Sequence, residues 1–269
     1  FFTYRHQDEI DATVAKVMQQ KDPVYDFVSD DGIGHALWLM DSEEDINAIQ
    51  AAFAKLPYLY VADGHHRTAS AAKVGLVRRE QNPDYTGEEE FNFFMTVIFP
   101  DNQLKIFDYN RVVKDLNGLT EDEFLAKVRE KFSVEPVSQA EPFRPSKLHE
   151  FGMYLGGTWY KLEALPGTWD NTNVVDSLDV SIMQNNLLHP ILGIGDPRRD
   201  NRIDFVGGIR GLGELVRRVD SGREVVAFAM FPTSMDELLG IADAGEIMPP
   251  KSTWFEPKLR SGLFIHPLQ

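Results

Sequence analysis

One run of five residues, Asp63-Gly64-His65-His66-Arg67, has the highest density in the sequence of residue types that bind ligands or catalyse reactions. An apolar β-type stretch precedes this run and alanines that favour a helix follow it, so the run lies where a strand turns into a helix. The free N–H groups and the dipole of a first helical turn attract an anion. Gly64 lets a ligand approach the main chain closely, and Arg67 offers paired donors that match phosphate oxygens. With the two histidines as further donors, the run predicts a phosphate cradle.

The residue types do not dictate a single role for the acidic residue of this run. Asp63 can cap the helix, orient a histidine, hold a metal ion that bridges to phosphate, or act as a base. Because an aspartate and a histidine can both exchange a proton with a substrate, Asp63 and His65 are the candidate catalytic residues. The residues expected to bind the phosphate or nucleotide are Gly64, His66, Arg67 and Thr68, with the helix running from Thr68 onward.

Two other interpretations of the run remain open. In the first, Asp63 is a simple N-cap and its neighbours form a solvated turn. In the second, Asp63, His65 and His66 hold the metal ion of a hydrolase. Adjacent histidines diverge on most backbones, however, and the run has neither HxH nor HExxH spacing. The phosphate cradle is preferred, and no metal ligands are assigned.

A second candidate for the same ligand is the sequence MPPKST near the end of the chain. Lys251, Ser252 and Thr253 follow a rigid Pro-Pro pair, and a lysine with two hydroxyls suits a phosphate or carboxylate. The glycine spacing of a Walker loop is missing. A surface turn that enters a strand accounts for the same residues, but we add all three to the expected ligand-binding set.

Other polar or glycine-rich stretches have simpler explanations. The sequence VGGIRGLGEL, with glycines from Gly207 to Gly213, lacks the GxGxxG order of a dinucleotide loop, so it predicts tight packing. GDPRRDNR pairs acids with arginines and predicts a self-neutralising solvated loop. In DGIGH, Asp31 and His35 either line the same cleft as the DGHHR run or form an ordinary turn. The phenylalanines between Phe91 and Phe99 are expected in a sheet core.

Composition limits the partners of the protein. The 269 residues include 42 acidic and 27 basic side chains, for a formal net charge of −15. Such a surface repels polyanions, so no nucleic-acid partner is expected. Solvent ions screen the repulsion within about 10 Å, so a local basic cluster can still hold a small phosphorylated ligand.

Cysteine is missing from the sequence, which excludes disulfides, thiolate nucleophiles and cysteine metal sites. No apolar run approaches the roughly 20 residues that span a bilayer, so no membrane partner is expected. These features suit a cytoplasmic protein. The chain begins at Phe1 with a stretch typical of a strand that enters a helix, and we expect an N-terminal segment to be missing.

Hydrophobic periodicity predicts helices and strands mixed along the whole chain. Short strands are expected at 36–40, 58–62 and 224–232, and a hairpin is expected around PDNQ at 100–103. Helices are predicted by the following patterns: apolar spacing over 8–20, the Ser42 cap, a Thr120/Glu123 capping box, the segment 180–192 that contains or ends near Pro190, and a capped stretch after Thr233. Gly75 suits a helix C-terminus, and residues 137–147 are the best candidate linker or excursion. The fold class is a mixed sheet, α/β or α+β.

Three stretches together carry a resemblance to a known family. VADGHHRTASA, DDGIGHALWLM and GEIMPPKSTWFEPKLRSGL resemble an uncharacterised prokaryotic family, domain-of-unknown-function family ten-fifteen, from the first residues to the last. More distantly, the turn Gly64-His65-His66-Arg67 looks like the phosphate-binding turn of ParB-type domains, sulfiredoxin and free-serine kinases. The resemblance implies a ParB/sulfiredoxin-like part over 1–117, lacking its N-terminal segment, and a mixed α+β part with the KST residues over 118–269.

The resemblance narrows the expected activity. His65 stands where sulfiredoxin has its reactive cysteine, which excludes sulfinic-acid repair, and the acidity of the chain opposes a DNA-binding role. What it implies is a nucleotide- or phosphate-binding protein, using ATP or ADP with Mg²⁺, that transfers a phosphoryl group to a small hydroxyl-bearing molecule. The sequence shows no upstream carboxylate base of the kind such a kinase needs. A non-catalytic nucleotide sensor or partner-binding module is the alternative, and a metal-dependent hydrolase is the third. The oligomeric state is left open.

Overall fold

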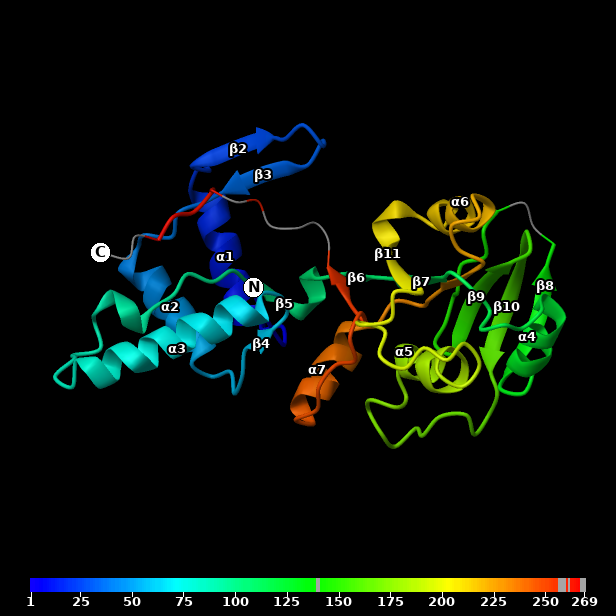
Figure 1. Cartoon of the computed structure of the whole chain (residues 1–269). Coiled ribbons are helices and arrows are strands. Elements are labelled where there is room, and N and C mark those ends of the chain that lie inside the picture. The colour runs from blue at the N-terminus through cyan, green and yellow to red at the C-terminus, as the bar shows by residue number, and fades with distance from the viewer. Residues whose placement is uncertain (139–140, 256–259, 261, 267–269) are drawn as a thin grey trace. The chain divides into compact units, whose positions relative to one another are not determined.

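The computed structural model describes residues 1–138, 141–255, 260 and 262–266, and it has the predicted mixed α+β architecture (Figure 1). Packing divides the chain into two compact units. The first comprises Phe1–Leu104 with Ser261–Gln269, and the second comprises Lys105–Arg260. Among the described residues, no helix is long and apolar enough to cross a membrane.

The first unit is built around a small three-stranded sheet of order β4-β1-β5, in which β1 pairs antiparallel with β4 and parallel with β5. Its core is small: buried Tyr4, Ile10 and Ala52 pack with half-buried neighbours from α2. The elements of this unit are β1 (Phe2–Tyr4), α1 (Asp8–Gln20), β2 (Tyr25–Val28), β3 (Gly34–Leu37), α2 (Glu43–Phe53), β4 (Tyr60–Val61), α3 (His65–Gln81) and β5 (Ile98–Pro100), with short 3₁₀ turns at Glu90–Asn92 and Asp101–Gln103.

The second unit is a six-stranded antiparallel sheet of order β11-β7-β12-β9-β10-β8 with helices packed on it. Its elements are β6 (Ile106–Phe107), β7 (Tyr109–Val113), α4 (Glu121–Val128), β8 (Phe132–Val137), β9 (Glu150–Leu155), β10 (Thr158–Ala164), α5 (Asp179–Met183) with a π-helical turn (Gln184–Leu188), β11 (Ile203–Gly207), a 3₁₀ turn (Gly208–Arg210), α6 (Gly213–Asp220), β12 (Val226–Ala229), α7 (Met235–Asp243) and β13 (Trp254–Phe255).

Alternation along the strands gives this sheet a core on each face, because successive side chains of a strand point to opposite sides. On β12, Val226 and Phe228 join the larger core with α4 and α5, whereas Ala227 and Ala229 join the smaller core with Leu215 of α6. β12 therefore reads as a continuous apolar run, which is typical of a strand covered on both faces.

Most predicted helices are confirmed, and their caps explain where they begin. Ser42 accepts the Asp45 N–H, Thr120 and Glu123 form a reciprocal capping box, and Ser234 forms the same box with Glu237. The helix after Leu178 ends at Leu188, before Pro190, as its sequence predicted.

Several local predictions are wrong or shifted. The phenylalanines expected in a sheet core include Phe93 and Phe94, which are exposed. The hairpin around residues 100–103 does not form, because β5 pairs with β1 while β6 pairs with β13. The strand expected at 36–40 is β3, Gly34–Leu37, paired with β2. Gly75 does not end its helix, which continues to Gln81. A Cβ there would lie 3.1 Å from the Phe91 carbonyl oxygen, so the glycine allows close packing. Helix α3 also begins at His65 rather than Thr68.

Residues 105–117, assigned from the sequence to the first part, pack in the second unit because β7 is a central strand of its sheet. The segment 137–147 joins β8 to β9 within that unit; it is an excursion rather than a linker, and its residues 139–140 lie outside the described residues. The predicted tight packing of the glycines is confirmed at two positions. A Cβ on Gly207 would lie 2.7 Å from the Trp254 ring, and one on Gly208 would lie 2.2 Å from the Asp108 carboxylate.

Candidate phosphate-binding site

The DGHHR run lies directly after β4, at the start of helix α3 in the first unit. Gly64 is the N-cap, with φ 83° and ψ 29° in the left-handed region that glycine adopts without a Cβ penalty. The Asp63 carboxylate accepts the Gly64 N–H at 2.8 Å. These two features turn the chain sharply enough for the helix to begin at His65, three residues earlier than the sequence predicted.

The early start places the basic side chains inside the first helical turn. The intrahelical ladder begins where the Thr68 N–H donates to the Gly64 carbonyl oxygen at 3.0 Å. The N–H groups of His65, His66 and Arg67 precede this bond, so the helix offers them no acceptor. All three side chains are exposed and Thr68 is half-buried. The turn therefore presents main-chain and side-chain donors together.

The charge of this helix start is unusual within the molecule. Among the α-helices of the described residues, all others carry an acidic residue in the first turn, and α3 carries none. An acid there would compensate the positive end of the helix dipole. In α3 the positive end remains available to an external anion.

Arg67 folds back toward the turn. A Cβ placed on Gly64 would lie 3.4 Å from Nη2 of Arg67 and 3.6 Å from its Nε. The guanidinium therefore lies beside the glycine N-cap and close to the free N–H groups of the turn. Its planar fork of donors suits the oxygens of a phosphate.

The two histidines point in different directions, because consecutive residues of a helix are about 100° apart around its axis. His65 and His66 thus cannot both ligate one ion through adjacent helical positions. Among the described residues, no group of three or more His, Cys, Asp and Glu side chains has the arrangement of a metal site. The Asp63 carboxylate holds the turn in place by accepting the Gly64 N–H. This contact was not among the four roles that the residue type of Asp63 suggested.

Lys251, Ser252 and Thr253 lie in the second unit, whereas residues 63–68 lie in the first. Ser252 is buried and its hydroxyl donates to the Pro249 carbonyl oxygen at 2.6 Å. The Lys251 ammonium lies 5.6 Å from the centre of the Tyr109 ring and 5.5 Å from that of Phe205. Thr253 is half-buried. The residues Glu256 to Leu259 and Ser261 of the same motif lie outside the described residues.

The structure also reveals a polar residue to which the sequence analysis gave no role. Arg111 lies in β7 with only 4% of its surface exposed. Burial lowers the pKa of its guanidinium to about 10, so it remains a cation at neutral pH. The sequence signal is a lone arginine followed by two valines in a strand that is buried on both faces. Such an arginine requires a partner inside the protein.

The chain resembles known proteins in its sequence and in its structure. The family model described as "Protein of unknown function (DUF1015)" matches residues 1–181. A conserved hypothetical protein from Pyrococcus furiosus aligns over 95% of this chain and 89% of its own, with 14% identity and a TM-score of 0.38. A free serine kinase in complex with AMP aligns over 94% and 81%, with 12% identity and a TM-score of 0.36. No curated protein matches the chain.

Proposed function

Because the chain belongs to the DUF1015 family of proteins of unknown function, as its motifs predicted, we propose a function from its own residues: the protein binds the phosphate groups of a small molecule at Gly64–Arg67. The ligand class is a nucleotide, ADP or ATP. Residues 63–68 lie entirely within the first unit. The proposal therefore depends only on the local geometry of β4 and α3.

The observation that carries the proposal is the position of Arg67 beside the left-handed Gly64 N-cap of a helix without acids in its first turn. Free N–H groups, the positive end of the helix dipole and a guanidinium then act on the same place. A hydrogen bond to a charged group contributes about 1.5–3 kcal/mol, and the dipole adds about 0.3–1 kcal/mol. Several such contacts together outweigh the screened repulsion from the net negative charge.

The expected nucleotide–Mg²⁺ pair fits the residue types of this turn. Mg²⁺ is commonly held by one or two carboxylates together with the substrate phosphates, and Asp63 supplies one carboxylate. In a phosphoryl transfer to a hydroxyl, Asp63 or His65 would take the hydroxyl proton, while Arg67 and His66 would stabilise the phosphate charge. The predicted contribution of Lys251, Ser252 and Thr253 is not part of this proposal, because these residues lie in the second unit.

Binding without turnover is the second candidate function. The Asp63 carboxylate already accepts the Gly64 N–H, and the first turn of α3 holds no other carboxylate. A base engaged with the main chain is less available for proton transfer. This geometry therefore favours a nucleotide sensor over a kinase, and the absence of any product would support that choice.

Calorimetric titration of the full chain with ADP and ATP, with and without Mg²⁺, tests the binding proposal. Arg67→Gln should weaken binding about tenfold or more, since it removes a charge-assisted contact. Arg78→Gln, which removes an exposed arginine from the other end of the same helix, is the matched control and should bind like the wild type. Equal affinities of both variants would refute the cradle. Product formation with a panel of small alcohols and hydroxy acids then separates kinase from sensor.

A further inference from the structure

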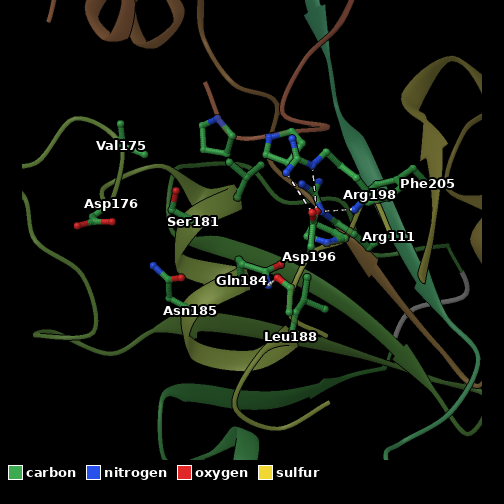
Figure 2. Close-up of a pocket in the computed structure, with 15 residues that line it drawn as sticks. Arg111, Val175, Asp176, Ser181, Gln184, Asn185, Leu188, Asp196, Arg198 and Phe205 are labelled. Carbon is green, nitrogen blue, oxygen red and sulfur yellow. Dashed lines mark hydrogen bonds and ion pairs between the residues drawn. The ribbon is translucent and has the colours of Figure 1, made fainter. Parts of the chain in front are cut away.

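A cavity of about 450 Å³ lies within the second unit, on the side of the sheet where α5 and its π-helical turn pack (Figure 2). Its wall combines apolar and polar residues in similar numbers. The helical segment contributes Ser181, Gln184 and Leu188, and β11 contributes Phe205. A volume of this size matches the lower range of small-molecule sites.

Arg111 supplies a buried positive charge to the wall of this cavity. Its Nη1 donates to the Tyr109 carbonyl oxygen and its Nη2 donates to the Lys251 carbonyl oxygen at 3.1 Å. The guanidinium also lies 5.6 Å from the centre of the Phe205 ring. Two neutral acceptors and a ring do not balance a full charge, and within the described part of the chain Arg111 forms no ion pair.

The carboxylates around the cavity do not supply the missing charge. Asp196 is engaged by Arg198, whose Nε and Nη2 both donate to it at 3.0 Å. Asp176 lines the opposite end of the cavity, beside Asn185 (Figure 2). Asp179 is buried close enough to attract Arg111 electrostatically, but it forms no ion pair with it. Its carboxylate accepts the His149 N–H, and burial raises its pKa to about 7, which weakens its charge at neutral pH.

Other wall residues suit an organic ligand. The Ser181 hydroxyl is nearly buried and forms no side-chain hydrogen bond with the described residues, so its donor is available. Val180, Leu188 and Phe205 offer apolar contact area next to it. A ligand with one charged end and an apolar body would satisfy both parts of the wall.

We propose that this cavity binds a small organic monocarboxylate, whose carboxylate pairs with Arg111 and whose apolar body contacts Phe205 and Leu188. A monoanion fits better than a phosphate because one unpaired guanidinium balances one negative charge, whereas Arg198 is already neutralised by Asp196. The site is separate from residues 63–68, and the inference does not rest on the proposed nucleotide function.

The test uses the full chain and four carboxylate probes, acetate, butanoate, benzoate and phenylacetate, with benzamide as the neutral analogue of benzoate and inorganic phosphate as the competing anion. At least one carboxylate should bind saturably by calorimetry, and benzoate should bind about tenfold or more tightly than benzamide. Arg111→Met should weaken carboxylate binding by a similar factor, whereas Arg217→Gln, which removes an exposed arginine of α6, should not. ADP affinity serves as an independent readout and should be unchanged in Arg111→Met.

A crystal of the wild type soaked in 4-bromobenzoate keeps the test decisive if Arg111→Met fails to fold. The anomalous signal of bromine should lie in the cavity, with the carboxylate on Arg111. The proposal is overturned if no carboxylate binds at millimolar concentration, if benzamide binds as well as benzoate, if phosphate binds more tightly, or if bromine is bound only elsewhere.

Discussion

The guanidinium of Arg67 lies beside Gly64, close enough that a Cβ on residue 64 would meet Nη2 at 3.4 Å. This relationship joins a side-chain cation to the free N–H groups at the start of α3. It depends on the left-handed conformation of Gly64, because that conformation lets the helix begin at His65. The glycine therefore has both a folding role and a binding role.

Replacing this glycine should affect both roles. In Gly64→Ala we expect the free energy of unfolding to fall by about 1–2 kcal/mol, the cost of the left-handed conformation for a residue with a Cβ. Phosphate binding should weaken as well, because the new methyl group would contact Arg67. Urea unfolding and ADP titration measure the two effects.

The control for this substitution is Gly34→Ala. Gly34 has no positive φ, and a Cβ there would meet no atom within 4 Å. If Gly64→Ala unfolds at the same urea concentration as Gly34→Ala, the conformation assigned to Gly64 is wrong.

Asp179 should make the second unit less stable as the pH rises. Its folded pKa is about 7, raised chiefly by burial and further by Glu237, against an ordinary value of 3.8. Between these pH values the folded state holds a proton that the unfolded chain has lost, so the free energy of unfolding falls by an amount on the order of a few kcal/mol. Above pH 7 both states are ionised and this slope ends.

His149 acts in the opposite direction, because burial lowers the pKa of its imidazole and its stabilising contribution is lost as the pH falls. Asp179→Asn isolates the aspartate contribution. Urea unfolding at pH 5 and pH 8 should show a smaller loss of stability in this variant than in the wild type. Glu130→Gln removes an exposed carboxyl group and should retain the wild-type loss; an unchanged loss in Asp179→Asn would contradict the assignment.

Gly208 should tolerate no side chain. A Cβ would lie 2.2 Å from Oδ1 of Asp108, a buried carboxylate that also accepts the Asn110 side-chain amide at 2.6 Å. Gly208→Ala is therefore expected to lower the free energy of unfolding by about 1–3 kcal/mol or more through overpacking. Gly213→Ala lies in helix α6 with open space around the new methyl group and should be neutral or stabilising. Thermal unfolding of both variants measures the difference, and equal midpoints would refute the close contact.

The sequence predicted those features that depend on local signals. The capping box at Thr120 and Glu123 identifies its helix without tertiary information, and glycine crowding correctly indicated tight packing at Gly207. The start of α3 was missed because it depends on the left-handed Gly64 and on the Asp63 contact, which the sequence does not specify. The hairpin at 100–103 failed because β5 and β6 have partners distant in the chain, β1 and β13.

The candidate sites also differ in whether local sequence or the tertiary fold brings their residues together. The DGHHR run was recognisable because its donor types are adjacent in sequence. The Arg111 cavity was not, because its wall is assembled from β7, α5, β11 and the loops near Asp196 and Pro249. Only the tertiary fold brings these segments together. A single buried arginine in a strand gives at most an indirect signal.

The central claim, that the start of α3 binds phosphate, is tested most directly by the backbone amide resonances of isotope-labelled full-length protein during an ADP titration. The account predicts that the amides of Gly64, His65, His66 and Arg67 shift with a common saturation curve, and that Arg67→Gln weakens this curve about tenfold. Saturable shifts elsewhere in the chain, with these four amides unmoved, would contradict it.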